Sequence, residues 1–336
     1  MPAVETRNLT KHYVSHKKMP GMRGTIRSLF TRQKTIVEAV SGIDMTIEQG
    51  ELVGFLGPNG AGKTTTLKML CGILYPTSGE ASVLGYTPYE RNFEMLRNIS
   101  LVMGNKNQLW WDLPAWDSFV VLKEVYEVPD DKFKKRTDFL IETLQLTDKI
   151  NTQVRKLSLG ERMKCELVAA LLHAPRVVFL DEPTLGLDVV SQKRIRDFLK
   201  DLHREDNCTL LLTSHYMQDV QELCDRVVVI DRGVIVYEGT LGALSREFSS
   251  ARRLRLAFER PVDPADLERY GKLVEQGETS VVLEVPREKT AQVTAAVLQA
   301  FPVSDVGIEE VAIEEVVRSL FSRTETSAAE AGAAKG

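Results

Sequence analysis

The sequence of 336 residues is longer than one ordinary domain, which predicts one large domain and a smaller one. A hydrophobic share of 43% supplies a sizeable core, and a net charge of −4 argues against nucleic-acid binding. The four cysteines lack the paired spacing of zinc or redox sites, so we expect reduced thiols of a cytosolic protein. Neither a signal-like start nor an apolar run near the roughly 18–20 residues that span a bilayer occurs, so we expect a soluble chain.

The first segment with a distinct composition is basic. Residues 6–37 contain eight Lys or Arg residues and no Asp or Glu. Within it, one helical face collects Met22, Ile26, Leu29 and Phe30, which predicts a short amphipathic helix. Such a basic helix can lie on an anionic membrane surface or against the cytoplasmic side of a membrane partner. A solvated charged helix that packs on its own domain is an equally good interpretation.

Short apolar runs alternate with helical patterns through residues 40–240. The runs are rich in Val, Ile and Leu, as buried parallel strands are. They occupy residues 51–57, 99–104, 176–181, 208–214 and 226–231. About 70 residues of mostly helical pattern separate the second run from the third, which is too long for a single crossover helix. We therefore expect an α/β core with a helical subdomain inserted at about residues 105–175.

The sequence GPNGAGKT, residues 57–64, follows the first of these strands and opens a helix. It matches the phosphate-loop pattern G-x-x-x-x-G-K-[ST] in the strand-to-helix context that the pattern requires. Backbone N–H groups of such a loop surround the β-phosphate, and the helix N-terminus adds roughly half a positive charge. We expect Lys63 to reach the β- and γ-phosphates of ATP and Thr64 to hold Mg²⁺. The expected ATP contacts of this segment are Gly57, Pro58, Asn59, Gly60, Ala61, Gly62, Lys63, Thr64 and Thr65.

Two adjacent carboxylates, Asp181 and Glu182, follow the apolar residues of the third strand. Carboxylates at the end of a buried strand are costly unless a cation lies nearby. Asp181 is therefore the expected outer ligand of Mg²⁺ through water, and Glu182 is the expected general base that orients the attacking water. Together with the phosphate loop, this pair predicts the hydrolysis of a bound nucleotide.

The character of the sequence changes after residue 240. An alternating strand, a second strand, a helix, an extended segment and a final helix are predicted in turn at residues 252–261, 279–286, 287–301, 303–310 and 313–321. The order strand, helix, two strands, helix, strand is that of a small ferredoxin-like α+β domain, which we expect at residues 241–322. Residues 323–336 have no apolar surface to bury, which predicts a disordered tail.

Two further segments carry a resemblance to a known family. LSLGERMKCEL, residues 157–167, resembles the signature motif of ATP-binding cassette (ABC) proteins, and LLLTSHYM, residues 210–217, resembles their switch segment. The order of phosphate loop, signature, carboxylate strand, Asp188 and His215 is similar to that family over roughly residues 3–240. The resemblance implies an ABC-type P-loop NTPase core that uses ATP and Mg²⁺.

The resemblance also implies a role for each matching residue. Ser158 and Gly160 would contact the γ-phosphate bound by an opposite cassette, so that two ATP molecules lie between two cassettes. Asp188 would lie at that interface, and His215 would touch the γ-phosphate and sense its loss. Tyr13 stands where the family stacks an aromatic residue on adenine.

Some positions depart from the commonest family pattern. Leu159 and Glu161 replace a glycine and a glutamine of the signature. The family's Q-loop glutamine meets Mg²⁺ and the membrane partner, and an ungapped alignment places Asn105 there, with Gln108 three residues later. The sequence leaves open which of these two amides approaches Mg²⁺.

All the tryptophans of the chain, Trp110, Trp111 and Trp116, lie within seven positions. In transporters of this family, that place belongs to a groove that receives a short helix of the membrane subunit. Clustered aromatic residues flanked by polar ones suit a protein interface. We expect Trp110 and Trp111 to dock on the partner, whereas Trp116 either docks or packs inside the helical subdomain. The insertion at residues 14–37 is a second expected contact, with an anionic membrane surface.

The pattern is most similar to ATPases that serve ABC-2-type permeases, which export drugs, lipids or polysaccharides. It implies an ATPase subunit at the cytoplasmic face of a bacterial plasma membrane, paired with a second copy and bound to integral membrane permease subunits. The alternative is a soluble ABC ATPase that acts on the ribosome or nucleic acid. Such proteins usually contain two cassettes, a coiled coil or a zinc module. Only 95 positions separate Lys63 from Ser158, without heptads or a cysteine cluster, which favours the exporter.

Overall fold

The structure, a computed structural model, describes residues 1–16, 34–104, 106–214 and 216–321. The chain divides into two compact units, Met1–Glu238 and Gly239–Gly336. The amphipathic helix expected around Met22 and the tail expected at 323–336 lie outside the described residues. Within the described ranges, no helix is long and apolar enough to cross a membrane. As expected, free thiols occur at four buried positions, Cys71, Cys165, Cys208 and Cys224.

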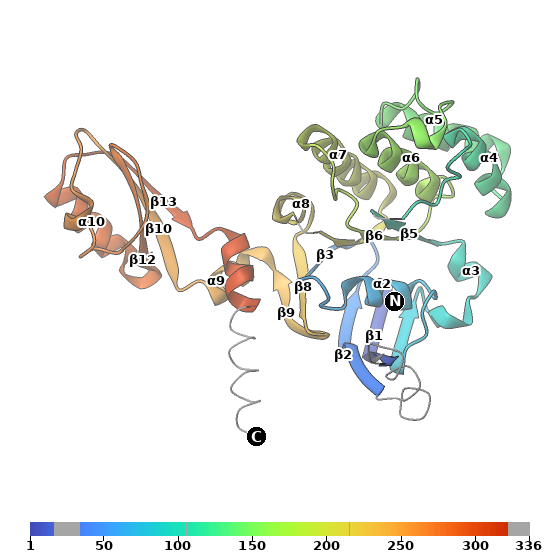
Figure 1. The fold of residues 1–336 in the computed structure, drawn as a ribbon, viewed down its shortest axis with the longest axis horizontal. Helices are drawn as coiled ribbons and strands as arrows, with labels where there is room; N and C mark the ends of the chain where they lie inside the picture. Colours follow the sequence, from blue (N-terminus) through green and yellow to red (C-terminus); the bar gives the residue numbers. More distant parts are fainter. Residues whose placement is uncertain (17–33, 105, 215, 322–336) are drawn as a thin grey trace, which may run out of the picture. The chain divides into compact units, whose positions relative to one another are not determined.

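A six-stranded sheet organises the first unit, with the strand order β5-β6-β7-β3-β8-β9 (Figure 1). Its strands are β3 (Leu52–Leu56), β5 (Ile99–Met103), β6 (Val177–Asp181), β7 (Thr209–Thr213), β8 (Arg226–Asp231) and β9 (Val234–Thr240). The pairings among β3, β5, β6, β7 and β8 are all parallel, which confirms the five apolar runs as strands. Because the carboxyl ends of parallel strands share one edge, the loops after β3, β6 and β7 come together there.

A three-stranded antiparallel sheet, of order β2-β1-β4, forms a second layer of this unit. It consists of β1 (Val4–His16), β2 (Lys34–Ile47) and β4 (Ser78–Val83). Helix α2 (Lys63–Leu70) contacts β2 and β4 as well as β6, and so lies between the two sheets (Figure 1). The described ends of the expected insertion prolong β1 and β2 as a hairpin, in which Val14 faces Ile36.

Helices fill the expected subdomain between β5 and β6 (Figure 1). Its main elements are α4 (Ala115–Val125), α5 (Asp130–Thr143), the short 3₁₀ helix η2 (Val154–Lys156) and α6 (Leu159–Leu171). Pro114 and Pro129 stand directly before α4 and α5, and acidic residues occupy the first turn of each helix, where they complement the helix dipole. The other helices of this unit are η1 (Pro88–Glu90), α3 (Phe93–Leu96), α7 (Val189–Asp206) and α8 (Met217–Leu223).

The second unit is built on a four-stranded sheet of order β11-β12-β10-β13, in which every pairing is antiparallel. Its elements are α9 (Leu241–Phe248), β10 (Ala251–Phe258), η3 (Pro264–Asp266), β11 (Lys272–Gln276), β12 (Ser280–Pro286), η4 (Arg287–Lys289), α10 (Thr290–Ala300), β13 (Val303–Glu310) and a helix at 313–321. This is the expected ferredoxin-like strand order, and Leu254, Leu256 and Phe258 of β10 lie in its core.

One expected element of this domain is different. The first helix of the ferredoxin-like order is only the 3₁₀ turn η3. The helical conformation starts at Pro264, which occupies the first helical position, and ends after Asp266. Asp263 accepts a hydrogen bond from the Ala265 N–H and caps a single turn instead.

A stacked histidine stabilises the junction between the helical subdomain and the six-stranded sheet. The His173 ring lies parallel to the Tyr126 ring, with ring centroids 3.8 Å apart. Its Nε2 lies 3.3 Å from the Ile99 carbonyl oxygen, and its buried Nδ1 has no hydrogen-bond partner among the described residues. Burial lowers the pKa of His173 to about 4, so the ring is neutral in the fold at pH 7.

This histidine should make stability depend on pH. Between pH 6.5 and pH 4, the His173 side chain is protonated in the unfolded chain and neutral in the fold. The reason is that its pKa is 6.5 in the unfolded chain and about 4 in the fold. The contribution of neutral His173 to the free energy of unfolding is therefore complete above pH 6.5 and is lost as the pH falls toward 4. Denaturant unfolding should show that the free energy of unfolding falls by ~2 kcal/mol more in wild type than in His173→Phe when the pH is lowered from about 7 to about 5. An equal fall of the unfolding free energy in wild type and His173→Phe would show that His173 is not the source of this pH dependence.

Candidate functional site

The phosphate loop joins β3 to α2, and its path requires glycine at two positions. Gly62 has a φ of 114°, and a Cβ there would lie 2.5 Å from the Ala39 carbonyl oxygen. A Cβ on Gly57 would lie 2.3 Å from the Ile230 carbonyl oxygen. The loop therefore packs directly on the backbones of β2 and β8. This close packing fixes the loop before any ligand binds.

Lys63 is folded back over this loop. Its Nζ donates hydrogen bonds to the carbonyl oxygens of Gly57, at 2.7 Å, and Pro58, at 3.1 Å. Burial lowers the pKa of Lys63, although the nearby carboxylates of Glu182 and Asp181 act in the opposite direction. A buried ammonium group that donates hydrogen bonds to neutral carbonyls is a suitable partner for a phosphate, which offers it a full negative charge.

Asp181, which ends β6, joins the start of α2 to the end of β7. The Thr64 hydroxyl donates to its Oδ2 at 2.8 Å, and the Thr213 hydroxyl donates to its Oδ1 at 2.7 Å. Thr213 ends β7, and the sequence analysis did not identify it, although a polar residue that ends a buried apolar run was a usable signal. The structure thus brings Thr64 and Asp181 together, as expected from their separate motifs.

The same two residues fit a magnesium ion. Hydroxyl and carboxylate oxygens are hard ligands of the kind that Mg²⁺ prefers. Among the described residues, no group of three or more His, Cys, Asp or Glu could hold a metal by itself. Mg²⁺ commonly takes one or two protein ligands and completes its shell with substrate phosphates and water. The donor set therefore suits a metal that arrives with a nucleotide.

Glu182 has an unusual backbone conformation. Its φ is +57°, in the left-handed region that non-glycine residues seldom occupy. Its N–H group donates to the carbonyl and hydroxyl oxygens of Thr213, both at 3.1 Å. On the other side, a Cβ on Gly104 would lie 2.2 Å from the Glu182 carbonyl oxygen. The ends of β5 and β7 therefore hold Glu182 in a conformation that costs energy, as is common at functional sites.

The signature segment begins helix α6 with a reciprocal cap. The Glu161 N–H donates to the Ser158 hydroxyl at 3.2 Å, and the Ser158 N–H donates to the Glu161 carboxylate at 2.9 Å. This is a capping box. The Ser158 N–H and the Lys149 ammonium lower the pKa of Glu161. The glutamate that replaces the family's glutamine thus stabilises the helix terminus, and Ser158 stays exposed.

The signature also contacts the segment that begins α7. Asp188 caps this helix by accepting hydrogen bonds from the Ser191 N–H and hydroxyl, at 2.9 and 2.6 Å. Gly160 is buried, and a Cβ there would lie 2.7 Å from the Ser191 hydroxyl oxygen. The structure therefore brings Gly160 close to Ser191, the residue that Asp188 caps, within one chain.

At the Q-loop, Asn105 lies outside the described residues, as does His215 at the switch segment. Gln108 donates its side-chain amide to the Leu101 carbonyl oxygen of β5. Its backbone N–H donates to the Glu166 carboxylate at 3.0 Å. Burial raises the pKa of Glu166, a residue of α6 that the sequence analysis did not identify. The Gln108 side chain is therefore bound to β5 in this structure.

The tryptophan pair and Trp116 have different environments. Trp110 and Trp111 are each 45% exposed, and the Arg162 guanidinium lies 5.1 Å from the Trp111 ring centroid. The Trp116 ring packs 5.8 Å from the ring of Phe133, inside the helical subdomain. Trp116 therefore packs inside the helical subdomain, which is one of the two roles expected for it. Trp110 and Trp111 remain accessible.

A groove lies between the six-stranded sheet and α4. It has a volume of about 530 Å³, and its lining includes Ile73, Phe93, Leu101, Gln108, Val125 and Tyr126. Phe93 and Val125 are largely exposed. Gln108 belongs to this lining and precedes Trp110 by two positions in the sequence, whereas neither Trp110 nor Trp111 lines the groove.

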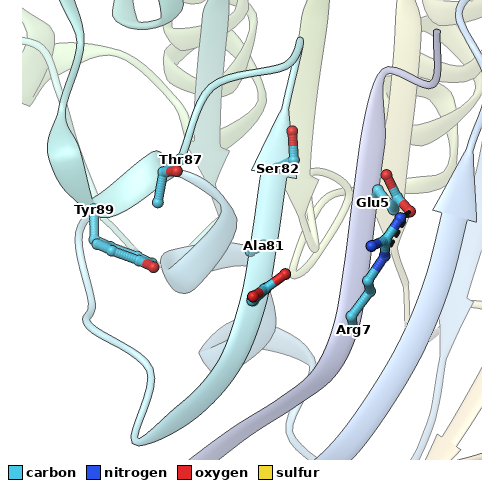
Figure 2. A pocket seen from close by; sticks show the side chains of 7 residues that line it. Glu5, Arg7, Ala81, Ser82, Thr87 and Tyr89 are labelled. Carbon is cyan, nitrogen blue, oxygen red and sulfur yellow. Dashed lines mark hydrogen bonds and ion pairs between the residues drawn. The ribbon is translucent and has the colours of Figure 1, made fainter.

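Tyr13 lies on the hairpin of β1 and β2, half-exposed and opposite Val37. The Lys11 ammonium is 5.6 Å from its ring centroid. A separate polar hollow of about 400 Å³ lies on β1 and β4 (Figure 2). The Arg7 guanidinium pairs with the Glu5 carboxylate there, at 2.7 Å. Figure 2 shows this pair by dashed lines. No phosphate-loop residue lines this hollow, so it is distinct from the candidate nucleotide site.

Comparisons with known proteins agree with this geometry. Residues 40–185 match the ABC transporter family, and residues 250–309 match the C-terminal domain of EvrA-like ABC transporters. The ABC transporter ATP-binding protein NatA of Bacillus subtilis is 36% identical, over 64% of this chain and 87% of its own length. The bacitracin transport ATP-binding protein BcrA of Bacillus licheniformis is 31% identical, over 70% of this chain and 69% of its own.

A solved structure supports the fold. An ATP-binding cassette dimer in a post-hydrolysis state, bound to ADP and phosphate, is 23% identical and superimposes with a TM-score of 0.59, covering 70% of this chain and 98% of its own. This likeness supports the P-loop NTPase fold that the sequence predicts. On these grounds the chain belongs to the ATP-binding proteins of ABC transporters and is an ATPase.

Proposed function

We propose that the chain is the ATP-hydrolysing subunit of an ABC-2-type exporter. It powers transport through separate permease subunits and is held by them at the cytoplasmic face of a bacterial plasma membrane. ATP hydrolysis is supported above all by the contact of Thr64 and Thr213 with Asp181, beside the buried Lys63. A role in export is supported by the similarity to a bacitracin transport protein.

In this proposal Thr64 and Asp181 would hold Mg²⁺, Thr64 through its hydroxyl and Asp181 through a water molecule, and the metal would neutralise negative charge on the phosphates. Lys63 leaves its two carbonyl partners for the β- and γ-phosphates. Glu182 orients the attacking water, and His215 contacts the γ-phosphate. Because the Gln108 amide is bound to β5, we assign the Q-loop role to Asn105. Tyr13 stacks on the adenine.

We propose that a second copy of the chain completes each ATP site. Ser158 and Gly160 of one copy contact the γ-phosphate of the other, and Asp188 lies at the interface. The exposed residues beside Asp188 support this arrangement, because Val189 and Val190 are 74% and 62% exposed at the start of α7. Exposed apolar side chains of this kind commonly mark an interaction surface.

Replacement of the proposed base tests both the mechanism and the pairing. Glu182→Gln keeps the size of the side chain and removes the base, so it should still bind ATP and lower turnover at least ~100-fold. Light scattering should show a stable dimer when ATP is added. The double variant Glu182→Gln, Ser158→Arg should remain a monomer that still binds ATP. Lys63→Ala, made in the wild-type chain, should not hydrolyse ATP. Wild-type turnover in Glu182→Gln would remove this residue from the role.

We propose that the groove whose lining includes Gln108, together with Trp110 and Trp111, receives a short helix of the permease. The groove presents apolar side chains, and the two partly exposed tryptophans follow Gln108 closely in the sequence and offer large aromatic surfaces. Aromatic residues supply much of the binding energy of protein interfaces. Trp116 contributes less in this proposal, because its ring already packs on Phe133.

Single replacements of the pair test the docking proposal. Each tryptophan is more than half buried, so the double alanine variant would also weaken the fold of the subunit itself. Trp110→Ala and Trp111→Ala should each stay folded and bind the permease roughly thirtyfold more weakly, since loss of an aromatic anchor costs about 2 kcal/mol. The measurement is co-purification from native membranes, compared with the thermal midpoint of the isolated subunit.

A matched control is Phe139→Ala, which removes another exposed aromatic residue of the helical subdomain, outside the groove lining. It should co-purify with the permease as wild type does. A collapsed midpoint in the tryptophan variants would show that the pair belongs to the core. Normal co-purification of folded variants would equally end the docking proposal.

We also propose that the region of residues 14–37 contacts anionic lipid. Val14 and Ile36 face each other across the hairpin and are 57% and 60% exposed, and the surrounding sequence is basic. Exposed apolar side chains beside basic ones are typical of membrane-surface contacts. Sedimentation should show binding to phosphatidylglycerol-containing vesicles, roughly tenfold weaker for the double variant Val14→Asp, Ile36→Asp. Equal binding to pure phosphatidylcholine vesicles would contradict the electrostatic part of this proposal.

A further inference from the structure

A buried carboxylate lies behind the catalytic segments. Asp219, the third residue of α8, is fully buried and accepts hydrogen bonds from three other elements. The hydroxyls of Thr184 and Ser214 both donate to its Oδ2, the second at 2.7 Å. The Arg196 guanidinium of α7 donates to its Oδ1 at 2.9 Å. None of these four residues was identified from the sequence.

The charge of this carboxylate is balanced locally. The Arg196 side chain is only 2% exposed, and its Nε also lies 3.2 Å from the Glu222 carboxylate, an ion pair without hydrogen-bond geometry. Buried ion pairs often contribute little net stability, because desolvation offsets their attraction. The arrangement therefore calls for an explanation other than stability, and the two hydroxyl donors supply one.

The first hydroxyl donor belongs to the segment that contains the proposed base. Thr184 follows Glu182 by two residues and precedes Asp188 by four. The chain makes a compact turn here, in which the Leu185 N–H donates to the Glu182 carbonyl oxygen at 3.2 Å. The Leu187 N–H donates to the Thr184 carbonyl oxygen at 3.3 Å. The position of Thr184 therefore sets the path of the chain between Glu182 and Asp188.

The second hydroxyl donor belongs to the segment after β7. Ser214 directly follows Thr213, whose carbonyl and hydroxyl oxygens hold the Glu182 N–H. The Ser214 oxygen also accepts the Tyr216 N–H at 3.0 Å. Through one oxygen atom, Asp219 thus joins the segment that follows Glu182 to the segment that follows Thr213.

We propose that Asp219 is a positioning residue for ATP hydrolysis. Its Oδ2 holds Thr184 and Ser214 at a fixed separation, so that the turn from Glu182 to Asp188 cannot shift independently of the end of β7. The inference rests on the proposed role of Glu182. Asp219 itself touches neither the phosphate loop nor the Asp181 carboxylate in the contacts of this structure, and it acts only through the two hydroxyls.

Near-isosteric variants can remove each hydroxyl without removing the buried charge. Thr184→Val and Ser214→Ala should each lower kcat for ATP roughly tenfold and leave KM within about twofold, since they disturb geometry rather than nucleotide contacts. Because both bonds end on the same oxygen, the double variant should lose much less than the product of the two single losses. Thr184→Ser, which restores the hydroxyl, should restore kcat.

A control variant and a fold measurement keep this test specific. Glu222→Gln removes the other acidic partner of Arg196 but leaves all three bonds of Asp219, so its kcat should equal that of wild type. Asp219→Ala would leave Arg196 without its main partner and is less informative, because it can fail to fold. Thermal midpoints and ATP affinities, measured on the same samples, show whether Thr184→Val and Ser214→Ala are folded and bind ATP.

Two results would overturn the proposal. Unchanged kcat in folded Thr184→Val would show that the hydroxyl bond does not position the site. Failure of Thr184→Ser to restore kcat would show that side-chain bulk, and not the hydroxyl, matters. Neither result depends on Glu182→Gln, whose wild-type turnover would instead remove the proposed base.

Discussion

The carboxylate of Asp181 is the interaction on which the nucleotide site depends. It ends β6 and receives hydroxyl hydrogen bonds from Thr64, at the start of α2, and Thr213, at the end of β7. A carboxylate without such donors would be costly at the end of a buried strand. Its two bonds therefore fix the phosphate-loop helix and the neighbouring strand in one geometry, and a third element, β5, joins through the Gly104 N–H, which donates to the Asp181 carbonyl oxygen.

Glu166 extends this organisation from the nucleotide site to the groove. Its carboxylate accepts the N–H groups of Gln108 and Leu109, so the segment that leads to the tryptophans is attached to α6. The N-terminus of that same helix is the capped signature residue Ser158. A displacement of the proposed permease contact would therefore act directly on the helix that presents the signature. The connection consists of packed, hydrogen-bonded residues, and coupling energies along it are open to double-mutant cycles.

The parts of the fold that could be predicted from the sequence are those with a local pattern. The phosphate loop, the five parallel strands and the carboxylates after β6 each have a signature within about ten residues, because strand burial and loop geometry act locally. The helix at 313–321 was likewise predicted within its observed range. The ferredoxin-like order includes a helix between the first two strands of the C-terminal domain, and the structure has only the 3₁₀ turn η3 there.

The contacts that could not be predicted join residues far apart in the sequence. Glu166 meets Gln108 across 58 positions, and Thr184 meets Asp219 across 35. In a single sequence each of these is an ordinary polar residue on a helix or in a turn, and only the folded chain reveals that it is buried with a partner. The contact of Trp111 with Arg162 is of the same kind, since the Arg162 guanidinium belongs to α6, 51 positions further along the chain.

The most direct test of this organisation is the affinity of the site for a divalent metal. Mn²⁺, which replaces Mg²⁺ and is observed by electron paramagnetic resonance, can be titrated into the protein with a non-hydrolysable ATP analogue. Asp181→Asn keeps the shape of the side chain and one acceptor oxygen but removes the charge. If Asp181 holds the metal's water and the Thr64 helix, Mn²⁺ should bind at least tenfold more weakly to this variant, a loss of about 1.4 kcal/mol. Equal Mn²⁺ affinity in folded Asp181→Asn and wild type would contradict the central role of this carboxylate.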